Sequence, residues 1–99
     1  MGILDKAIEK YGERQRDQAQ EELAELIVAI SKYKRAAAKD INKDKAIIDV
    51  IEEIADVRIM IKQIMLMLDI KEVEINNVEI SKIKRLEKRM IESNDSSFL

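Results

Sequence analysis

The chain has no cysteine, no histidine and no proline among its 99 residues, and only two glycines and three aromatic residues. Without cysteine there are no disulfides, and without cysteine and histidine the usual zinc ligands are missing. The same absences exclude a thiol nucleophile and a histidine general base. A cysteine-free chain suits a reducing compartment and no leader pattern opens this one, so we expect a cytoplasmic protein.

Long apolar runs and a large excess of one charge are also missing. The longest unbroken apolar stretch is far shorter than the roughly 18 residues that span a bilayer, so we expect no membrane partner. Eighteen basic and twenty acidic side chains are mixed along the chain, and the net charge is −2. No overall field therefore attracts nucleic acid, and any binding of phosphate must be local.

The residues that are abundant, Ile, Leu, Ala, Glu and Lys, recur at helical spacing and predict an all-α, antiparallel helical bundle. The pattern predicts helices over residues 3–11, 13–38, 45–68 and 71–92, with Asp44 as the N-cap of the third. We expect one domain over 1–92 and a flexible tail over 93–99. Because so short a domain buries little surface and has no disulfide or structural zinc site to stabilise it, we expect a homodimer or homotetramer.

Two acidic motifs stand about thirty residues apart, EELAE at residues 21–25 and EEIAD at residues 52–56. Carboxylates three residues apart are neighbours on one helix face, roughly 5 to 6 Å between Cβ atoms. An E-x-x-E pair facing an E-x-x-D pair supplies four converging oxygen ligands, which are typical of a magnesium site. The alternative is an acidic face that is only solvated. It is less favoured because two acidic motifs of this spacing occur, on two helices that the connecting turn makes antiparallel.

On these motifs, EELAEL at residues 21–26 and EIADV at residues 53–57, the chain resembles the MazG-like all-alpha nucleoside triphosphate pyrophosphohydrolases in their small single-domain form. The resemblance extends from about residue 3 to residue 90. It implies that four carboxylates ligate the metal: Glu22, Glu25, Glu53 and Asp56.

The resemblance also implies a reaction. The cofactor would be Mg²⁺, with Mn²⁺ as a substitute, and water would attack the phosphate chain of an NTP or dNTP to release a nucleoside monophosphate and pyrophosphate. Glu21 or Glu22 would orient that water.

Four basic residues are candidates for binding the substrate. Lys32 and Lys34 follow the first acidic motif, although cations near a helix C-terminus commonly serve the helix dipole alone. Lys82 and Arg89 resemble the family's K-x-x-x-N-x-x-R segment, in which Leu86 takes the place of the asparagine. That departure weakens any prediction about recognition of the base or sugar.

Two other functions stay open at this point. A non-enzymatic helical adaptor would use the same carboxylates only to keep its surface soluble, and it would bind no metal. A phosphoribosyl-ATP pyrophosphohydrolase-like enzyme would share the site and differ in its substrate.

Overall fold

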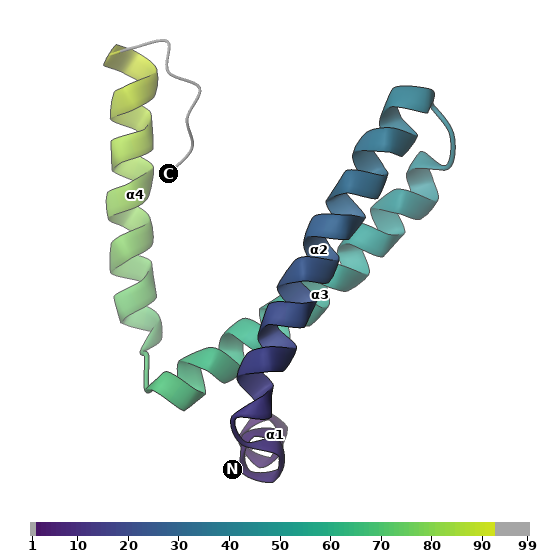
Figure 1. Ribbon diagram of the computed structural model, residues 1–99. Coiled ribbons are helices and arrows are strands. Elements are labelled where there is room, and N and C mark those ends of the chain that lie inside the picture. The colour runs from purple at the N-terminus through teal and green to yellow at the C-terminus, as the bar shows by residue number, and fades with distance from the viewer. Residues whose placement is uncertain (1, 93–99) are drawn as a thin grey trace. The chain divides into compact units, whose positions relative to one another are not determined.

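The computed structural model describes residues 2–92, which contain four α-helices and no strand (Figure 1). The helices are α1 (Ile3–Tyr11), α2 (Arg14–Lys39), α3 (Lys43–Leu68) and α4 (Glu72–Glu92). The prediction of an all-α protein is confirmed, and each observed boundary lies within two residues of the predicted one. The tail predicted over 93–99 lies outside the described residues. None of the helices described is long and apolar enough to cross a membrane.

Residues with positive φ separate the first three helices. Gly12 has φ +60° and donates its backbone N–H to the carbonyl of Ile8 at 2.7 Å, so it closes α1 in a conformation that glycine adopts without a Cβ clash. Asp40, with φ +54°, ends α2 in the left-handed region. Short polar side chains such as aspartate and asparagine tolerate this region better than other residues do.

The start of α3 corrects one prediction. Asp44 is not the N-cap, because α3 begins at Lys43 and Asp44 lies within its first turn. The residue before the helix is Asn42, whose carbonyl accepts the backbone N–H of Ala46 at 3.1 Å. Asp44 still favours the helix start, because a carboxylate in the first turn faces the positive end of the helix dipole.

Helices α2 and α3 lie side by side as an antiparallel hairpin, and α1 contacts both (Figure 1). Few side chains are buried in it. The buried apolar residues of residues 2–92 are Ala19, Ala29, Ala46, Val57 and Met60, and the buried polar residues are Gln15 and Gln63. The three alanines let the helices approach closely, but no large side chain among the described residues is fully buried. The hairpin therefore has a seam and no closed core.

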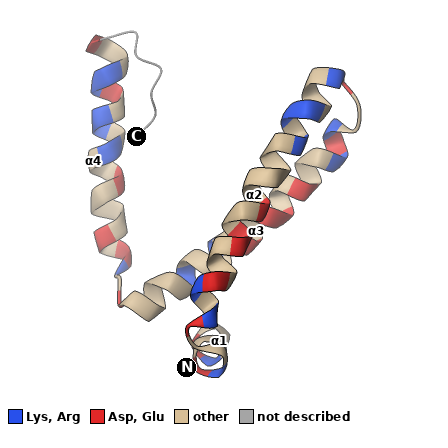
Figure 2. Cartoon of the chain, viewed as in Figure 1, with Lys and Arg blue, Asp and Glu red and all other residues tan. Residues whose placement is uncertain are grey.

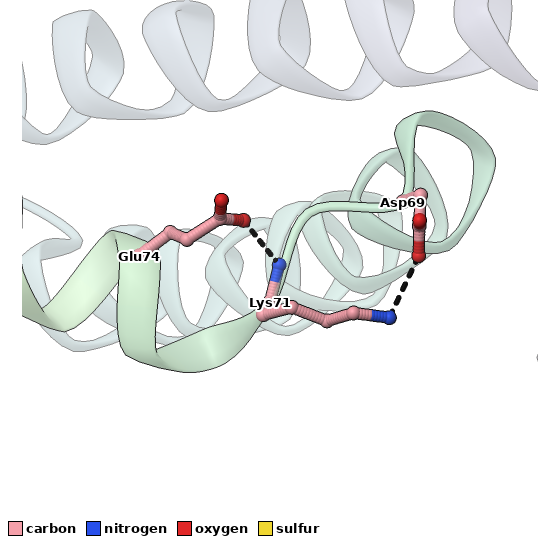
Figure 3. A network of polar contacts seen from close by, with 3 residues as sticks. All are labelled: Asp69, Lys71 and Glu74. Atoms are coloured by element: carbon pink, nitrogen blue, oxygen red, sulfur yellow. Dashed lines mark hydrogen bonds and ion pairs between the residues drawn. The ribbon is translucent and has the colours of Figure 1, made fainter.

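Helices α1 to α3 belong to one compact unit that ends at Leu68, and a second unit begins at Asp69. At the start of the second unit, the Nζ atom of Lys71 pairs with the Oδ1 atom of Asp69 at 2.7 Å (Figure 3). The Lys71 backbone N–H donates to the Oε2 atom of Glu74 at 2.8 Å, which satisfies one unpaired donor at the start of α4 (Figure 3). The hydrogen bond and charge of Lys71 lower the pKa of Asp69.

Helix α4 runs unbroken over its 21 residues and has no buried residue. The β-branched residues Val73, Ile75, Val78 and Ile80 lie within it, so their partly alternating pattern does not produce a strand. The predicted fourth helix is confirmed.

Candidate metal centre

Three carboxylates converge on one side of the hairpin, at about the middle of both helices. Glu22 comes from α2, whereas Glu53 and Asp56 come from α3, one turn apart. Each offers a carboxylate oxygen, and these three oxygens lie within 4.8 Å of one another. Figure 2 shows acidic residues gathered along the middle of both helices. The antiparallel turn thus brings the two predicted acidic motifs together.

Two of these carboxylates hold a shielded oxygen that accepts no hydrogen bond from the protein. The Oε2 atoms of Glu22 and Glu53 are shielded from solvent and have no hydrogen-bond partner. The other oxygen of Glu22, Oε1, accepts a hydrogen bond from the Nε2 atom of Gln18 at 2.9 Å. A shielded carboxylate oxygen without a partner is costly, and a cation bound by the two carboxylates would offset that cost.

The charges and burial around Glu22 and Glu53 also favour binding of a cation. Burial is the largest cause that raises the pKa of Glu22, and the charges of Glu25 and Asp56 raise it further against the opposing hydrogen bond from Gln18. Burial likewise raises the pKa of Glu53, followed by the charges of Glu25, Asp56 and Glu22. Within residues 2–92, no ion pair joins a Lys or Arg to the three clustered carboxylates. The clustered carboxylates therefore repel one another with no basic ion-pair partner in the described part of the chain.

Glu25 borders this cluster. It is not one of the three residues whose oxygens lie within 4.8 Å, yet its charge raises the pKa of both Glu22 and Glu53. Its role as a fourth ligand stays a prediction. Glu21, the other candidate for orienting water, is exposed and lies outside the cluster.

A recess of about 230 Å³ adjoins the carboxylates. Its lining includes one cation, Lys32, and the residues around that cation are Glu25, Val28, Ala29, Asp49, Glu52 and Glu53. Asp49 pairs with Lys45 at 3.3 Å. Lys32 is therefore the predicted substrate-binding residue that the structure places beside the carboxylates.

The other three basic candidates lie elsewhere. Lys34 is exposed and does not line the recess, because residues two apart on a helix point about 200° away from each other. Lys82 and Arg89 belong to α4 in the second unit, where their spacing of seven residues puts both on one face of that helix. Sequence reasoning missed Gln18, whose position four residues before Glu22 was the available signal.

Comparison of the chain with protein-family models, with curated proteins and with solved structures gives no significant match.

Proposed function

We propose that the chain is a Mg²⁺-dependent nucleoside triphosphate pyrophosphohydrolase of the MazG-like kind, which cleaves the α,β phosphoanhydride of an NTP or dNTP. The observation that supports this most is the pair of shielded, unpartnered Oε2 atoms of Glu22 and Glu53, with Asp56 beside them. An acidic helix surface that served only solubility would expose these oxygens to water.

The ligand set selects the class of metal. Carboxylate oxygens suit hard cations, and a site with a few protein oxygens leaves room for the waters and phosphate oxygens that complete a Mg²⁺ octahedron. Mn²⁺ is the expected substitute. When bound, the ion supplies charge neutralisation for the phosphates and lowers the pKa of water.

The protein's own side chains have three tasks in this proposal. Glu22, Glu53 and Asp56 hold the cation, and Lys32 binds the negative end of the polyphosphate in the adjoining recess. Glu22 also orients the attacking water, because the Gln18 amide donates a hydrogen bond to its Oε1 atom and fixes the side chain. Exposed Glu21 is the less suitable of the two candidates.

We further propose a cytoplasmic enzyme that works as a homodimer or homotetramer. Half-exposed isoleucines and leucines on every helix of the hairpin favour assembly over an isolated subunit.

A panel of canonical and damaged NTPs and dNTPs, with phosphoribosyl-ATP as a further substrate, tests the function. Purified protein is incubated with each nucleotide and Mg²⁺, and pyrophosphate release is measured with and without EDTA. The proposal expects release that EDTA abolishes and that Glu53→Gln removes, whereas Asp17→Asn, which deletes one charge from α2 outside the cluster, retains it. No release from any nucleotide would favour the adaptor, and release from phosphoribosyl-ATP alone would favour the related enzyme.

A further inference from the structure

Two buried glutamines lie opposite each other in the hairpin, two helical turns from the clustered carboxylates. Gln15 is 8 % exposed and Gln63 is 4 % exposed. Gln15 lies seven residues before Glu22 in α2, and Gln63 lies seven residues after Asp56 in α3. Seven residues of helix rise about 10.5 Å. Because the helices run antiparallel, both steps lead in the same direction, toward the N-terminal end of α2, and keep to the carboxylate side of the hairpin.

These two side chains lack the partners that buried amides usually have. The Oε1 atom of Gln63 is shielded and accepts no hydrogen bond from the protein. No hydrogen bond within residues 2–92 involves the side chain of Gln15. Buried side-chain amides are normally hydrogen-bonded, and leaving one unpaired costs stability. Two unpartnered amides beside a candidate site therefore point to a polar ligand that supplies the missing hydrogen bonds.

A recess of about 320 Å³ connects one of these glutamines with the carboxylates. Its lining residues are Tyr11, Arg14, Gln15 and Gln18. The Nε2 atom of Gln18 also donates to the Oε1 atom of Glu22 at 2.9 Å, so the recess and the cluster share the Gln18 side chain. The volume of the recess is that of a small-molecule site.

Tyr11 gives the recess a flat aromatic surface. The turn at Gly12, with φ +60°, separates Tyr11 at the end of α1 from Arg14 at the start of α2. The guanidinium carbon of Arg14 lies 5.7 Å from the centre of the Tyr11 ring, within the range of a cation–π contact. Tyr11 is 43 % exposed, so part of its ring is open to a ligand. Aromatic rings and guanidinium planes are the groups on which nucleobases stack.

The two recesses beside the carboxylates differ in their chemistry. Along α2, Lys32 lies ten residues after Glu22, whereas Gln15 lies seven residues before it. The recess of Lys32 offers a cation, and the recess of Gln15 offers amides and an aromatic ring. A nucleoside triphosphate has the same order, with anionic phosphates at one end and a planar, hydrogen-bonding base at the other.

We infer that the recess lined by Tyr11 and Gln15 holds the base of the nucleotide, and that the amides of Gln15 and Gln63 select it by its hydrogen-bonding edge. Because the unpartnered atom of Gln63 is an acceptor, the base has to present an N–H donor to it. The inference rests on the proposed function for the position of the phosphates. Gln15 and Gln63 are thus specificity-determining residues and take no part in the hydrolysis itself.

Binding of nucleotides that cannot be hydrolysed tests this selection. Isothermal titration calorimetry in Mg²⁺ compares α,β-methylene analogues of the common NTPs and dNTPs with inorganic tripolyphosphate. We expect the analogues to bind more tightly than tripolyphosphate, and methylation of the N–H group on the preferred base to remove that advantage. Gln15→Met and Gln63→Met should weaken the preferred analogue about tenfold, the size of one lost hydrogen bond, and leave tripolyphosphate unchanged. Gln20→Met is the matched control, because Gln20 is exposed on α2 and does not line the recess.

Thermal unfolding without nucleotide separates recognition from a structural role. An amide kept for a ligand is unpaired in the free protein, so Gln63→Met should leave the Tm unchanged or raise it. Tripolyphosphate that binds as tightly as every analogue, or an equal loss of tripolyphosphate affinity in the methionine variants, would overturn the inference. So would a lower Tm of Gln63→Met with unchanged nucleotide affinity.

The outcomes also distinguish this inference from the proposed hydrolysis. Pyrophosphate release from NTPs without any preference for a base would leave the hydrolase standing and overturn the base recess. Base-dependent binding without pyrophosphate release would do the reverse. Absence of binding by every probe would overturn both.

Discussion

Replacing Glu22 by glutamine should change metal binding and apo stability in opposite directions. The substitution keeps the shape of the side chain and removes one negative charge from a cluster whose three oxygens lie within 4.8 Å of one another. Two unit charges at that distance interact by about 1 kcal/mol in a water-like medium and about 3 kcal/mol at the effective dielectric of a protein surface. Glu22 is only partly buried, so the lower figure applies.

Without metal, Glu22→Gln loses repulsion with both Glu53 and Asp56 and should stabilise the protein by about 1 to 2 kcal/mol, a rise in Tm of roughly 4 to 16 °C for a domain of this size. A dication in the same space carries twice the charge. Removing one carboxylate ligand should therefore weaken the binding free energy of Mg²⁺ by on the order of 2 kcal/mol, which raises its Kd about thirtyfold.

Thermal unfolding in EDTA and in Mg²⁺ measures both effects on the same samples. We expect Glu22→Gln to melt above the wild type in EDTA and to gain less from Mg²⁺. Asp17→Asn is the matched control, because it removes one charge from the same helix outside the cluster. If Glu22→Gln lowered the Tm in EDTA and kept the full gain from Mg²⁺, the argument from charge repulsion would be refuted.

Three more outcomes follow from the same contacts. Because the pKa values of Glu22 and Glu53 lie above 4.5 in the folded chain, the apo protein should lose stability as pH rises from 4.5 through those values. Thermal unfolding at each pH should show that the rise in Tm on adding Mg²⁺ is largest near neutral pH. An equal rise at pH 4.5 would contradict this. In steady-state assays, Lys32→Ala should raise KM about tenfold with little change in kcat, whereas the control Lys39→Ala should leave KM unchanged. An unchanged KM in Lys32→Ala would show that Lys32 does not bind the substrate. Ala19→Leu should lower the free energy of unfolding, measured by chemical denaturation, by about 1 to 3 kcal/mol, because Ala19 is 1 % exposed between the helices. Ala24 is exposed, so Ala24→Leu is the control, and an equal loss of stability in both variants would refute the packing described.

Much of the fold follows from local pattern. The apolar periodicity and the scarcity of helix-breaking residues predict four helices, and Gly12 and Asp40 mark the ends of two of them. The Asp44 N-cap failed because several polar residues in one short turn compete for that role, and backbone dihedrals decide between them. Composition did not distinguish Asn42, which precedes α3 with φ +59°, from Asp44, which lies inside the helix, since both residue types are common near helix starts.

The candidate site was predictable to the level of helix faces. Spacing alone placed Glu22 on one face of its helix and Glu53 with Asp56 on one face of the next, and the short turn fixed the register between them. The separation of Lys32 from Lys34 also follows from helical geometry. Helical geometry does not predict which carboxylate oxygens become shielded, because that depends on side-chain rotamers and on close packing around Ala29.

The central claim is that Glu22, Glu53 and Asp56 bind a divalent cation, and Mn²⁺ titration followed by electron paramagnetic resonance tests it most directly. The signal of free Mn²⁺ should fall on adding wild-type protein and return on adding excess Mg²⁺. Glu53→Gln, shown by circular dichroism to keep its helices, should leave most of the Mn²⁺ free. Equal Mn²⁺ uptake by wild type and Glu53→Gln, or none by either, would contradict the account.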